Sequence, residues 1–284
     1  MLDRLMMDDR QFEEFIRTLV AAFPPRPYET ALLEQALGYP WQRPAGSYRV
    51  TDAGVEAVDD LTSAERERVL ARFTSDGSGR LPVLAFGSNA APGTLERKFA
   101  HFPEGEDRAV LALTGRLHDF DVGVAAQPTV YGSMPATLFP SPGTAVCATV
   151  LWVTAAQFTQ LTWSELSYRL GKLRARFDLD DDGTSVDEVL VFVSRFGAFC
   201  IDEHPVALAA IPAERRTAEE LTQEQLLDAA AALALGPAAD AETLVRAIFE
   251  EPGEIGPKIA ATVRKASQPF ASERWTPFVP DRVL

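Results

Sequence analysis

Apolar side chains recur every three or four positions near both ends of this chain, which is the spacing of an amphipathic helix. In residues 10–23 this pattern places Phe12, Phe15 and Leu19 on one face, and Pro24 ends it. Comparable patterns predict helices over residues 28–37 and 62–73, and later over residues 226–235, 240–250 and 256–266. Both ends of the chain are therefore expected to be helical.

The middle of the chain carries a different pattern, in which short apolar runs alternate with turn residues. Such runs predict strands, and they cover residues 81–86, 109–114, 132–139, 145–153 and 188–196. Residues 140–143 (Pro-Ser-Pro-Gly) are expected to form a turn, and residues 155–161 a short helix with Thr154 as its N-cap. Strands interrupted by so few helices favour a small antiparallel or mixed sheet, open or closed into a barrel, over a regular β-α-β alternation.

A polar loop at residues 75–79 (Ser-Asp-Gly-Ser-Gly) is the clearest boundary between these patterns. We therefore expect three segments along the chain. Residues 1–80 form a mostly helical extension, residues 81–210 form the sheet domain, and residues 211–284 form a helical extension packed on the body. The predicted fold class is α+β.

The composition is that of a soluble globular protein, with 46% hydrophobic and 24% charged residues among 284. Its 27 basic and 41 acidic residues give a net charge of −14. Phosphate contact needs clustered Lys and Arg, so nucleic acid and anionic membranes are not expected partners. No apolar run approaches transmembrane length, and no basic segment with an apolar stretch opens the chain, so we expect a cytoplasmic protein.

The side chains that most often bind metals are scattered along the chain. Cys147 and Cys200 lie far apart without a Cys-x-x-Cys spacing, and both are expected to be core thiols in a reducing compartment. The histidines show no metal-ligand spacing; they are His101, His118 and His204. No metal is therefore expected.

One acidic stretch resembles a known metal motif. Residues 178–183 (Asp-Leu-Asp-Asp-Asp-Gly) open like a calcium loop, but Val189 occupies the place of the last ligand, where a glutamate is needed. A solvated acidic hairpin turn is therefore the favoured interpretation of this stretch.

The stretch with the clearest functional signal follows the apolar run at residues 81–86. Gly87, Ser88 and Asn89 form a polar loop there, and Pro92 stands where a following helix would start. A loop between a buried strand and a helix can turn several backbone N–H groups toward a carboxylate or a phosphate. Because many strand-to-helix turns contain Gly, Ser and Asn, a purely structural turn is the alternative.

Familiar catalytic motifs are missing from the sequence. Ser88 lacks the Gly-x-Ser-x-Gly context of a nucleophile elbow, and there is no Gly-x-Gly-x-x-Gly and no phosphate-binding P-loop. The other chemical candidate is Glu165, a carboxylate in apolar company shortly after the helix predicted at residues 155–161. On composition alone, such a glutamate is more often solvated than catalytic.

A family resemblance links the loop and the glutamate. The sequence Ala-Phe-Gly-Ser-Asn at residues 85–89 resembles the Tyr-Gly-Ser-Asn signature of the γ-glutamylcyclotransferase-like superfamily. The order of the later pieces is also similar: a Pro-rich turn with Gly143, a Val-rich strand, a short helix, and Glu165 followed by Tyr168. The resemblance covers about residues 81–196 and implies a small mixed β-barrel with helices around it.

The resemblance implies an enzyme that uses neither metal nor cofactor. In that superfamily the signature loop binds the substrate through backbone N–H groups, and a glutamate is the general acid/base. The corresponding base here is Glu165, and the corresponding loop residues are Phe86, Gly87, Ser88, Asn89 and Ala90. Tyr168 is a further substrate contact or, equally, a packed aromatic residue with a satisfied hydroxyl.

The implied reaction is a transferase- or lyase-type amide cleavage of a small molecule. The free α-amino group of a γ-glutamyl amine or amide attacks its own γ-carbonyl, so that 5-oxoproline forms and an amine leaves. Such a reaction needs a folded substrate, a group that accepts a proton, and a donor that returns one to the departing nitrogen.

The chain departs from the family pattern at Phe86 and around Glu165, where the pattern has Asp after the leucine and Gly after the glutamate but this chain has Thr162 and Leu166. Phe86 replaces the usual tyrosine and removes one hydroxyl from the loop, while Trp163 and Leu166 around Glu165 are expected to make the pocket more apolar and larger. The departures leave two alternatives open. One is an amide hydrolase or acyl transferase on the same scaffold, and the other is a non-catalytic module that binds a small acid or a protein. The oligomeric state has no signal in the sequence.

Overall fold

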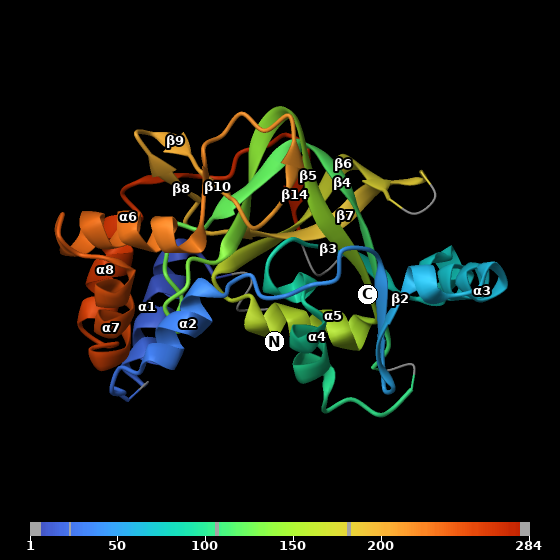
Figure 1. Ribbon diagram of the computed structural model, residues 1–284, viewed down its shortest axis with the longest axis horizontal. Helices are drawn as coiled ribbons and strands as arrows, with labels where there is room; N and C mark the ends of the chain where they lie inside the picture. The colour runs from blue at the N-terminus through green and yellow to red at the C-terminus, as the bar shows by residue number, and fades with distance from the viewer. Residues whose placement is uncertain (1–6, 23, 106–107, 181–182, 279–284) are drawn as a thin grey trace.

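Within residues 7–22, 24–105, 108–180 and 183–278, which the computed structural model describes, five strands close into a central β-barrel (Figure 1). They are β3 (Leu81–Ala85), β4 (Val110–Val124), β5 (Ala136–Val153), β6 (Tyr168–Leu179) and β7 (Ser185–Ser194). Their order is β5-β3-β7-β6-β4 and back to β5. Only β3 and β7 are parallel among these neighbours. The predicted α+β class with a small mixed barrel is therefore confirmed.

Strand β3 is the element that carries the polar loop, and it is covered on both faces. Leu84 points into the largest apolar cluster of the protein, whereas Val83 and Ala85 belong to a second cluster beneath the helices that follow. A strand buried on both sides reads as a continuous apolar run. Because of this continuous apolar run, the position of β3 and the place where it ends were predicted from the sequence.

The expected turn at residues 140–143 is wrong, because β5 runs through this segment as one strand. The register between β4 and β5 shifts at Phe120, which pairs with both Ala145 and Pro140. A β-bulge tolerates proline because ladder hydrogen bonds are given up there. The Pro-Ser-Pro-Gly segment therefore continues β5 through a bulge and does not end it.

Helices from both ends of the chain pack together on one side of the barrel (Figure 1). The amino-terminal helices are α1 (Asp9–Ala21), α2 (Thr30–Leu37) and α3 (Ser63–Thr74), and the carboxyl-terminal ones are α6 (Gln223–Leu235), α7 (Ala241–Glu250) and α8 (Ile255–Val263). Helix α2 contacts α6 and α7, whereas α3 lies apart, beyond the other end of the barrel. These helices confirm the ranges predicted from apolar spacing. The division of the chain into three segments stays a prediction.

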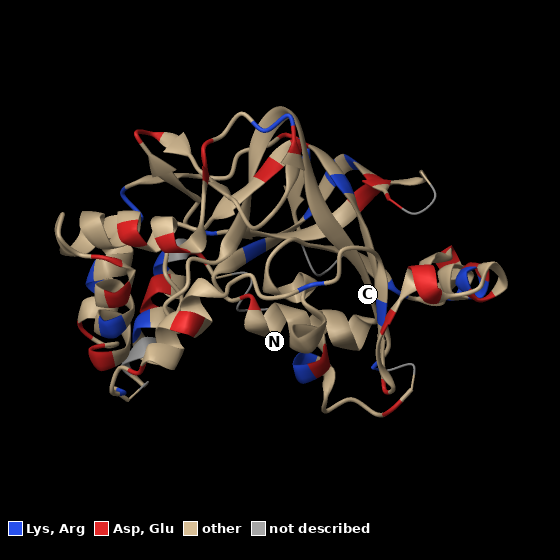
Figure 2. Ribbon diagram, in the orientation of Figure 1, with Lys and Arg blue, Asp and Glu red and all other residues tan. Residues whose placement is uncertain are grey.

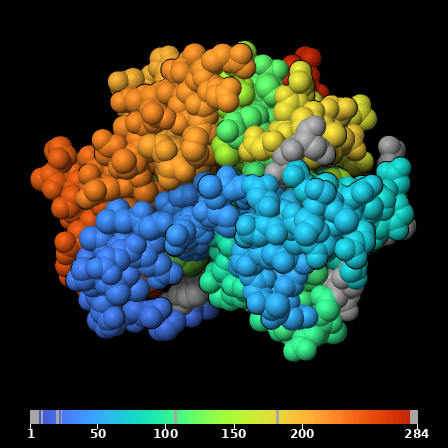
Figure 3. Space-filling view, turned by 45° about the vertical axis from the view of Figure 1, so that its right-hand side comes forward, coloured from blue at the N-terminus to red at the C-terminus, as the bar shows by residue number. Residues whose placement is uncertain are grey.

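The amino-terminal 80 residues also contribute a hairpin to the sheet. Its strands are β1 (Tyr48–Thr51) and β2 (Gly54–Ala57), and β1 pairs antiparallel with β4. Figure 3 shows these amino-terminal residues, blue to cyan, covering much of the lower half of the near face of the molecule in that view. The remaining elements are short; they are η2 (Val58–Asp60), η3 (Asp76–Ser78), β8 (Ala198–Ile201), β9 (His204–Pro205), β10 (Ala207–Leu208), β11 (Ala213–Glu214), β12 (Glu220–Leu221), β13 (Ser267–Gln268) and β14 (Trp275–Pro277).

Charged residues of both signs are interspersed along the helices and strand ends (Figure 2). Cys147 and Cys200 are free thiols. The acidic stretch at 178–183 joins the antiparallel strands β6 and β7, as a hairpin turn does, and its residues 181–182 lie outside the described ones. Among the described residues, no group of three or more His, Cys, Asp or Glu side chains is placed to hold a metal. None of the described helices combines the length and the apolarity that crossing a bilayer requires.

Candidate active site

The polar loop predicted from the sequence lies between β3 and α4 (Pro92–Phe99). Its last part forms a 3₁₀ turn, η4 (Ser88–Ala90), and Pro92 is the first residue of the helix, as expected. Four of the predicted loop residues line one pocket; they are Phe86, Gly87, Ser88 and Asn89. Ala90 is buried outside the pocket lining, and its N–H donates to the carbonyl oxygen of Gly87 at 3.0 Å. The pocket therefore receives only the first part of the loop.

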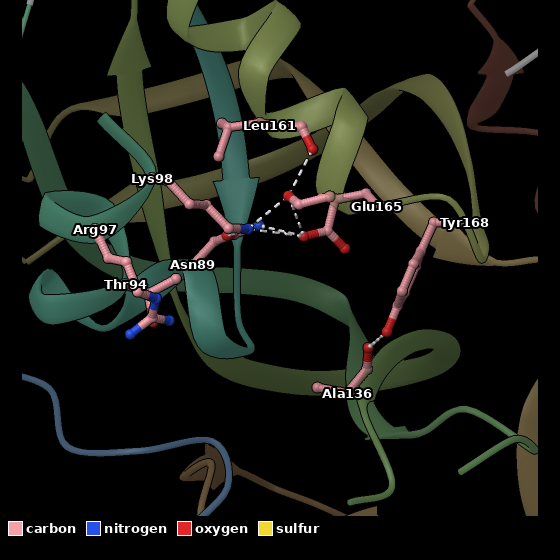
Figure 4. Close-up of polar contacts among 9 residues, drawn as sticks. Asn89, Thr94, Arg97, Lys98, Ala136, Leu161, Glu165 and Tyr168 are labelled. Carbon is pink, nitrogen blue, oxygen red and sulfur yellow. Dashed lines mark hydrogen bonds and ion pairs between the residues drawn. The ribbon is translucent and has the colours of Figure 1, made fainter. Parts of the chain in front are cut away.

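Glu165 lies directly beside this loop, at the C-terminal end of α5 (Ala155–Ser164) (Figure 4). Its Oε1 atom accepts a hydrogen bond from Asn89 Nδ2 at 3.0 Å and lies 3.3 Å from Lys98 Nζ. The side chain is 14% exposed, so the carboxylate is largely withdrawn from water. Its hydrogen bonds with described residues all use Oε1. Figure 4 shows Oε2 on the side of Tyr168, away from Lys98.

Lys98 connects the parts of this cluster and was not predicted from the sequence. Its Nζ donates to Asn89 Oδ1 and to Ser164 Oγ, both at 2.6 Å, and faces Glu165 as well. Attraction between the ammonium and the carboxylate offsets part of the cost of withdrawing both charges from water. Helical spacing contained a signal for this residue, because Lys98 lies one turn after Thr94 on α4 and both line the pocket.

Two buried tyrosines hold the peptide of Ala136 on another wall of the pocket. Tyr168 Oη donates to the carbonyl oxygen of Ala136 at 2.8 Å, and Tyr39 Oη accepts from its N–H at 2.7 Å. Burial raises the pKa of both hydroxyls, so both are neutral at physiological pH and neither is a base there. The sequence left two roles open for Tyr168, a substrate contact or a packed aromatic residue. Its ring lines the pocket, and its hydroxyl already donates a hydrogen bond to Ala136.

We expect the buried tyrosines to resist ionisation when the pH is raised. An unperturbed tyrosine loses its proton at a pH of about 10, whereas burial disfavours the charged form of Tyr39 and Tyr168. The unfolded chain then releases protons that the folded chain keeps, so folding stability is complete below a pH of about 10 and falls above it. Tyrosinate absorbance and circular dichroism, followed together in an alkaline titration, measure both effects. Ionisation of all five tyrosines before the fold is lost would contradict this expectation.

Tyr39 also explains why the loop has glycine at position 87. A Cβ atom on Gly87 would lie 2.5 Å from Tyr39 Oη and 3.3 Å from Ala136 Cβ. The φ of Gly87 is −100°, so the requirement is for space and not for a left-handed backbone. Phe86 brings no hydroxyl to the loop, but Tyr39, from the amino-terminal part of the chain, places one against it.

The outer part of the pocket is lined by Trp41, Tyr131 and Arg97. The expectation that Trp163 and Leu166 enlarge this pocket is wrong, because neither belongs to its lining. Trp163 precedes Glu165 by two residues at the end of α5, and side chains two positions apart on a helix point in different directions. Trp163 is 38% exposed.

Solved structures similar to this chain include a γ-glutamyl cyclotransferase. That match has 17% identity and a TM-score of 0.31, and it covers 40% of this chain and 66% of that protein. A protein from Arabidopsis thaliana has 18% identity and a TM-score of 0.33, with 43% and 73% covered. An uncharacterized protein from Homo sapiens has 14% identity and a TM-score of 0.31, with 67% and 89% covered. No protein-family model and no curated protein matches the chain.

Proposed function

We propose that this protein cyclises a γ-glutamyl amine or amide and releases 5-oxoproline and an amine. The observation that carries this proposal is the position of the Glu165 carboxylate beside the polar loop at residues 87–89, in one pocket. The reaction needs a group that moves a proton and a group that stabilises negative charge. A largely buried carboxylate and the backbone N–H groups of a loop before a helix are suited to these two roles.

Glu165 Oε2 accepts a proton from the α-amino group of the substrate in this mechanism. The freed amine attacks the γ-carbonyl carbon of the same molecule and closes a five-membered ring, and the proton returns to the departing nitrogen. Because both reacting groups belong to one molecule, holding the substrate in a folded conformation removes much of the barrier. Asn89 and Lys98 hold Oε1, so the carboxylate keeps one orientation while Oε2 exchanges protons.

The beginning of the loop binds the substrate in this proposal. Tyr39 Oη occupies the space beside Gly87, and the backbone N–H groups of the loop bind a substrate carboxylate or a developing oxyanion. The N-terminus of α4 follows directly and adds its positive dipole end. Arg97, exposed on the last turn of α4 and lining the same pocket, adds a cation for an anionic substrate.

A second candidate function is favoured by one observation, the ion pair between Lys98 and Glu165. A carboxylate that an ammonium already neutralises can act as a support for the loop, in which case the pocket binds a small acid without chemistry. An amide hydrolase or acyl transferase on the same scaffold would use Glu165 to activate a water molecule or an external amine instead.

A panel of γ-glutamyl amides incubated with the protein distinguishes these functions. Cyclisation produces 5-oxoproline and free amine in equal amounts, whereas hydrolysis produces glutamate and amine. A binding module shows saturable binding of the panel compounds and neither product. The proposed cyclisation is wrong if the protein binds members of the panel and never releases 5-oxoproline.

Replacing Lys98 by methionine is expected to lower both stability and turnover. The variant leaves the Glu165 carboxylate largely buried without its cation, which we expect to cost about 2 kcal/mol of unfolding free energy. Oε1 also loses a contact that orients the base, so turnover should fall with it. Thermal denaturation and single-turnover rates measure the two effects.

Lys172 offers a matched control for this substitution. It pairs with Glu188 at 3.0 Å, but the two side chains are 43% and 41% exposed, so water screens the pair. Lys172→Met should therefore change stability little and turnover not at all. Equal effects in the two variants would show that the buried pair of Lys98 and Glu165 has no special role.

A further inference from the structure

The mouth of the pocket has an aromatic wall, formed by Trp41 and Tyr131. These residues are distant in the sequence: Trp41 follows α2, and Tyr131 lies in the loop between β4 and β5. Their ring centroids are 6.5 Å apart with an interplanar angle of 43°, and Trp41 also contacts the ring of Tyr39 edge-on at 5.7 Å. The aromatic wall therefore continues from the buried Tyr39 outward to the surface.

The backbone at both residues of the aromatic wall is constrained. Trp41 has a φ of +67°, which a bulky residue adopts only when its surroundings enforce it, and its N–H donates to the carbonyl oxygen of Gly38 at 2.8 Å. Tyr131 lies in a tight turn closed by a hydrogen bond from Thr129 N to Ser133 O at 2.8 Å. Backbone strain of this kind concentrates at ligand-binding sites more than in ordinary cores.

The aromatic wall leaves apolar surface open to a ligand. Tyr131 is 41% exposed although it lines the pocket, and Trp41 is only partly buried. A centroid separation of 6.5 Å is near the outer limit for interacting rings, so the two rings do not stack closely on each other. A third ring placed at the mouth would gain contact with both, and Arg97 lines the same mouth with a guanidinium that interacts favourably with aromatic faces.

We infer that the amine released by this enzyme carries an aromatic ring, which binds against the aromatic wall of Trp41 and Tyr131. This inference rests on the proposed cyclisation. The γ-glutamyl part then occupies the inner pocket beside Glu165 and the loop, and the aromatic amine points outward. In the reaction the amide bond between the γ-carbonyl carbon and the aromatic amine breaks, and the bond from that carbon to the α-nitrogen forms. The proton lost by the α-nitrogen passes through Glu165 to the departing amine, so no further reactant is needed.

Three γ-glutamyl amides that differ only in the amine test this inference: the phenethyl, cyclohexylethyl and ethyl amides. Binding is measured in the Glu165→Gln variant, in which turnover is suppressed, and 5-oxoproline release is measured in the unaltered protein. We expect the phenethyl amide to bind at least tenfold more tightly than the ethyl amide, because a buried ring contributes apolar contact. We expect it to bind roughly fivefold more tightly than the cyclohexylethyl amide, because only the aromatic ring gains ring–ring geometry.

Substitutions in the aromatic wall show whether these rings cause the preference. Tyr131→Ala and Trp41→Leu, each combined with Glu165→Gln, should reduce the preference for the phenethyl amide several-fold. Val130 supplies a matched control, because it is adjacent to Tyr131, equally exposed at 41%, and outside the pocket lining. Val130→Ala should leave the preference unchanged. Tyr131 is a surface residue, so its variant is expected to fold even if Trp41→Leu does not.

The outcomes separate this inference from the proposed reaction. Equal binding of the phenethyl and ethyl amides, or of the phenethyl and cyclohexylethyl amides, overturns the aromatic site. If the preference for the phenethyl amide persists in Tyr131→Ala, the aromatic amine does not bind against the wall of Trp41 and Tyr131. A preference that depends on the aromatic wall, without 5-oxoproline release from any of the three amides, supports the aromatic site and overturns the cyclisation.

Discussion

Replacing Glu165 by glutamine is expected to lower the rate of 5-oxoproline release by roughly a hundredfold to ten-thousandfold. The amide has the size of the carboxyl group but takes up no proton at neutral pH. Substrate affinity should change little, because the loop at residues 87–89 and the outer pocket hold the substrate. Single-turnover rates and equilibrium binding, measured on the same preparations, separate the chemical step from binding.

The glutamine variant is expected to remain folded with somewhat reduced stability. Its amide oxygen can still accept hydrogen bonds from Asn89 and Lys98, but the Lys98 ammonium, only 15% exposed, loses its negative partner. Glu188→Gln is a matched control, since Glu188 is also paired with a lysine, at 3.0 Å, and lies outside the pocket lining. Unaltered turnover in Glu165→Gln would overturn the proposed mechanism, and equal losses in both variants would make the effect nonspecific.

Replacing Gly87 by valine is expected to weaken ligand binding by roughly a hundredfold while the protein stays folded. A Cβ atom at this position would lie 2.5 Å from Tyr39 Oη, so the tyrosine ring must move. That movement breaks the hydrogen bond between Tyr39 and Ala136 and pushes side-chain atoms into the pocket. Titration of a γ-glutamyl amide and thermal denaturation measure binding and folding separately.

Gly93 provides the control for this substitution. It lies six residues farther along, in the first turn of α4, and a Cβ atom there would meet nothing within 4 Å. Gly93→Val should therefore leave binding unchanged. Binding that persists in Gly87→Val would remove the loop from the site, and a Gly87→Val chain that does not fold would support a purely structural turn.

Strand β6 has an apolar pattern too weak to be recognised in the sequence. It was not predicted, although Tyr168, Leu170, Leu173 and Phe177 are buried along it. Exposed arginines stand between the buried residues; they are Arg169, Arg174 and Arg176. The alternation of buried and exposed residues also changes phase at Leu170 and Gly171, which are both buried, and the register with β7 shifts farther along, between Arg174 and Phe177. A strand with one solvent-exposed face and a bulge produces a weaker apolar pattern in the sequence than β3, which is buried on both faces.

Some parts of the candidate site could also be predicted from neighbouring residues, whereas others depend on contacts between distant parts of the chain. Helix α5 begins where the sequence predicted, because Thr154 accepts from Gln157 N at 3.2 Å in a capping box. Helix α4 begins at Pro92 for a similarly local reason. The starts of these two helices and the polar loop before α4 could therefore be located from neighbouring residues, whereas Glu165, beyond the predicted end of α5, was singled out through the family resemblance.

By itself, the sequence determined the pieces of this protein whose signals are local: the helices at both ends, the buried strand β3, the loop after it, and the start of α5. Only the tertiary structure decided which residues surround that glutamate. Asn89 meets Glu165 across 76 positions of the chain, and Tyr39 meets Ala136 across 97. Such contacts exist because the barrel closes and the amino-terminal segment packs against it, and no local spacing of apolar and polar residues encodes that closure.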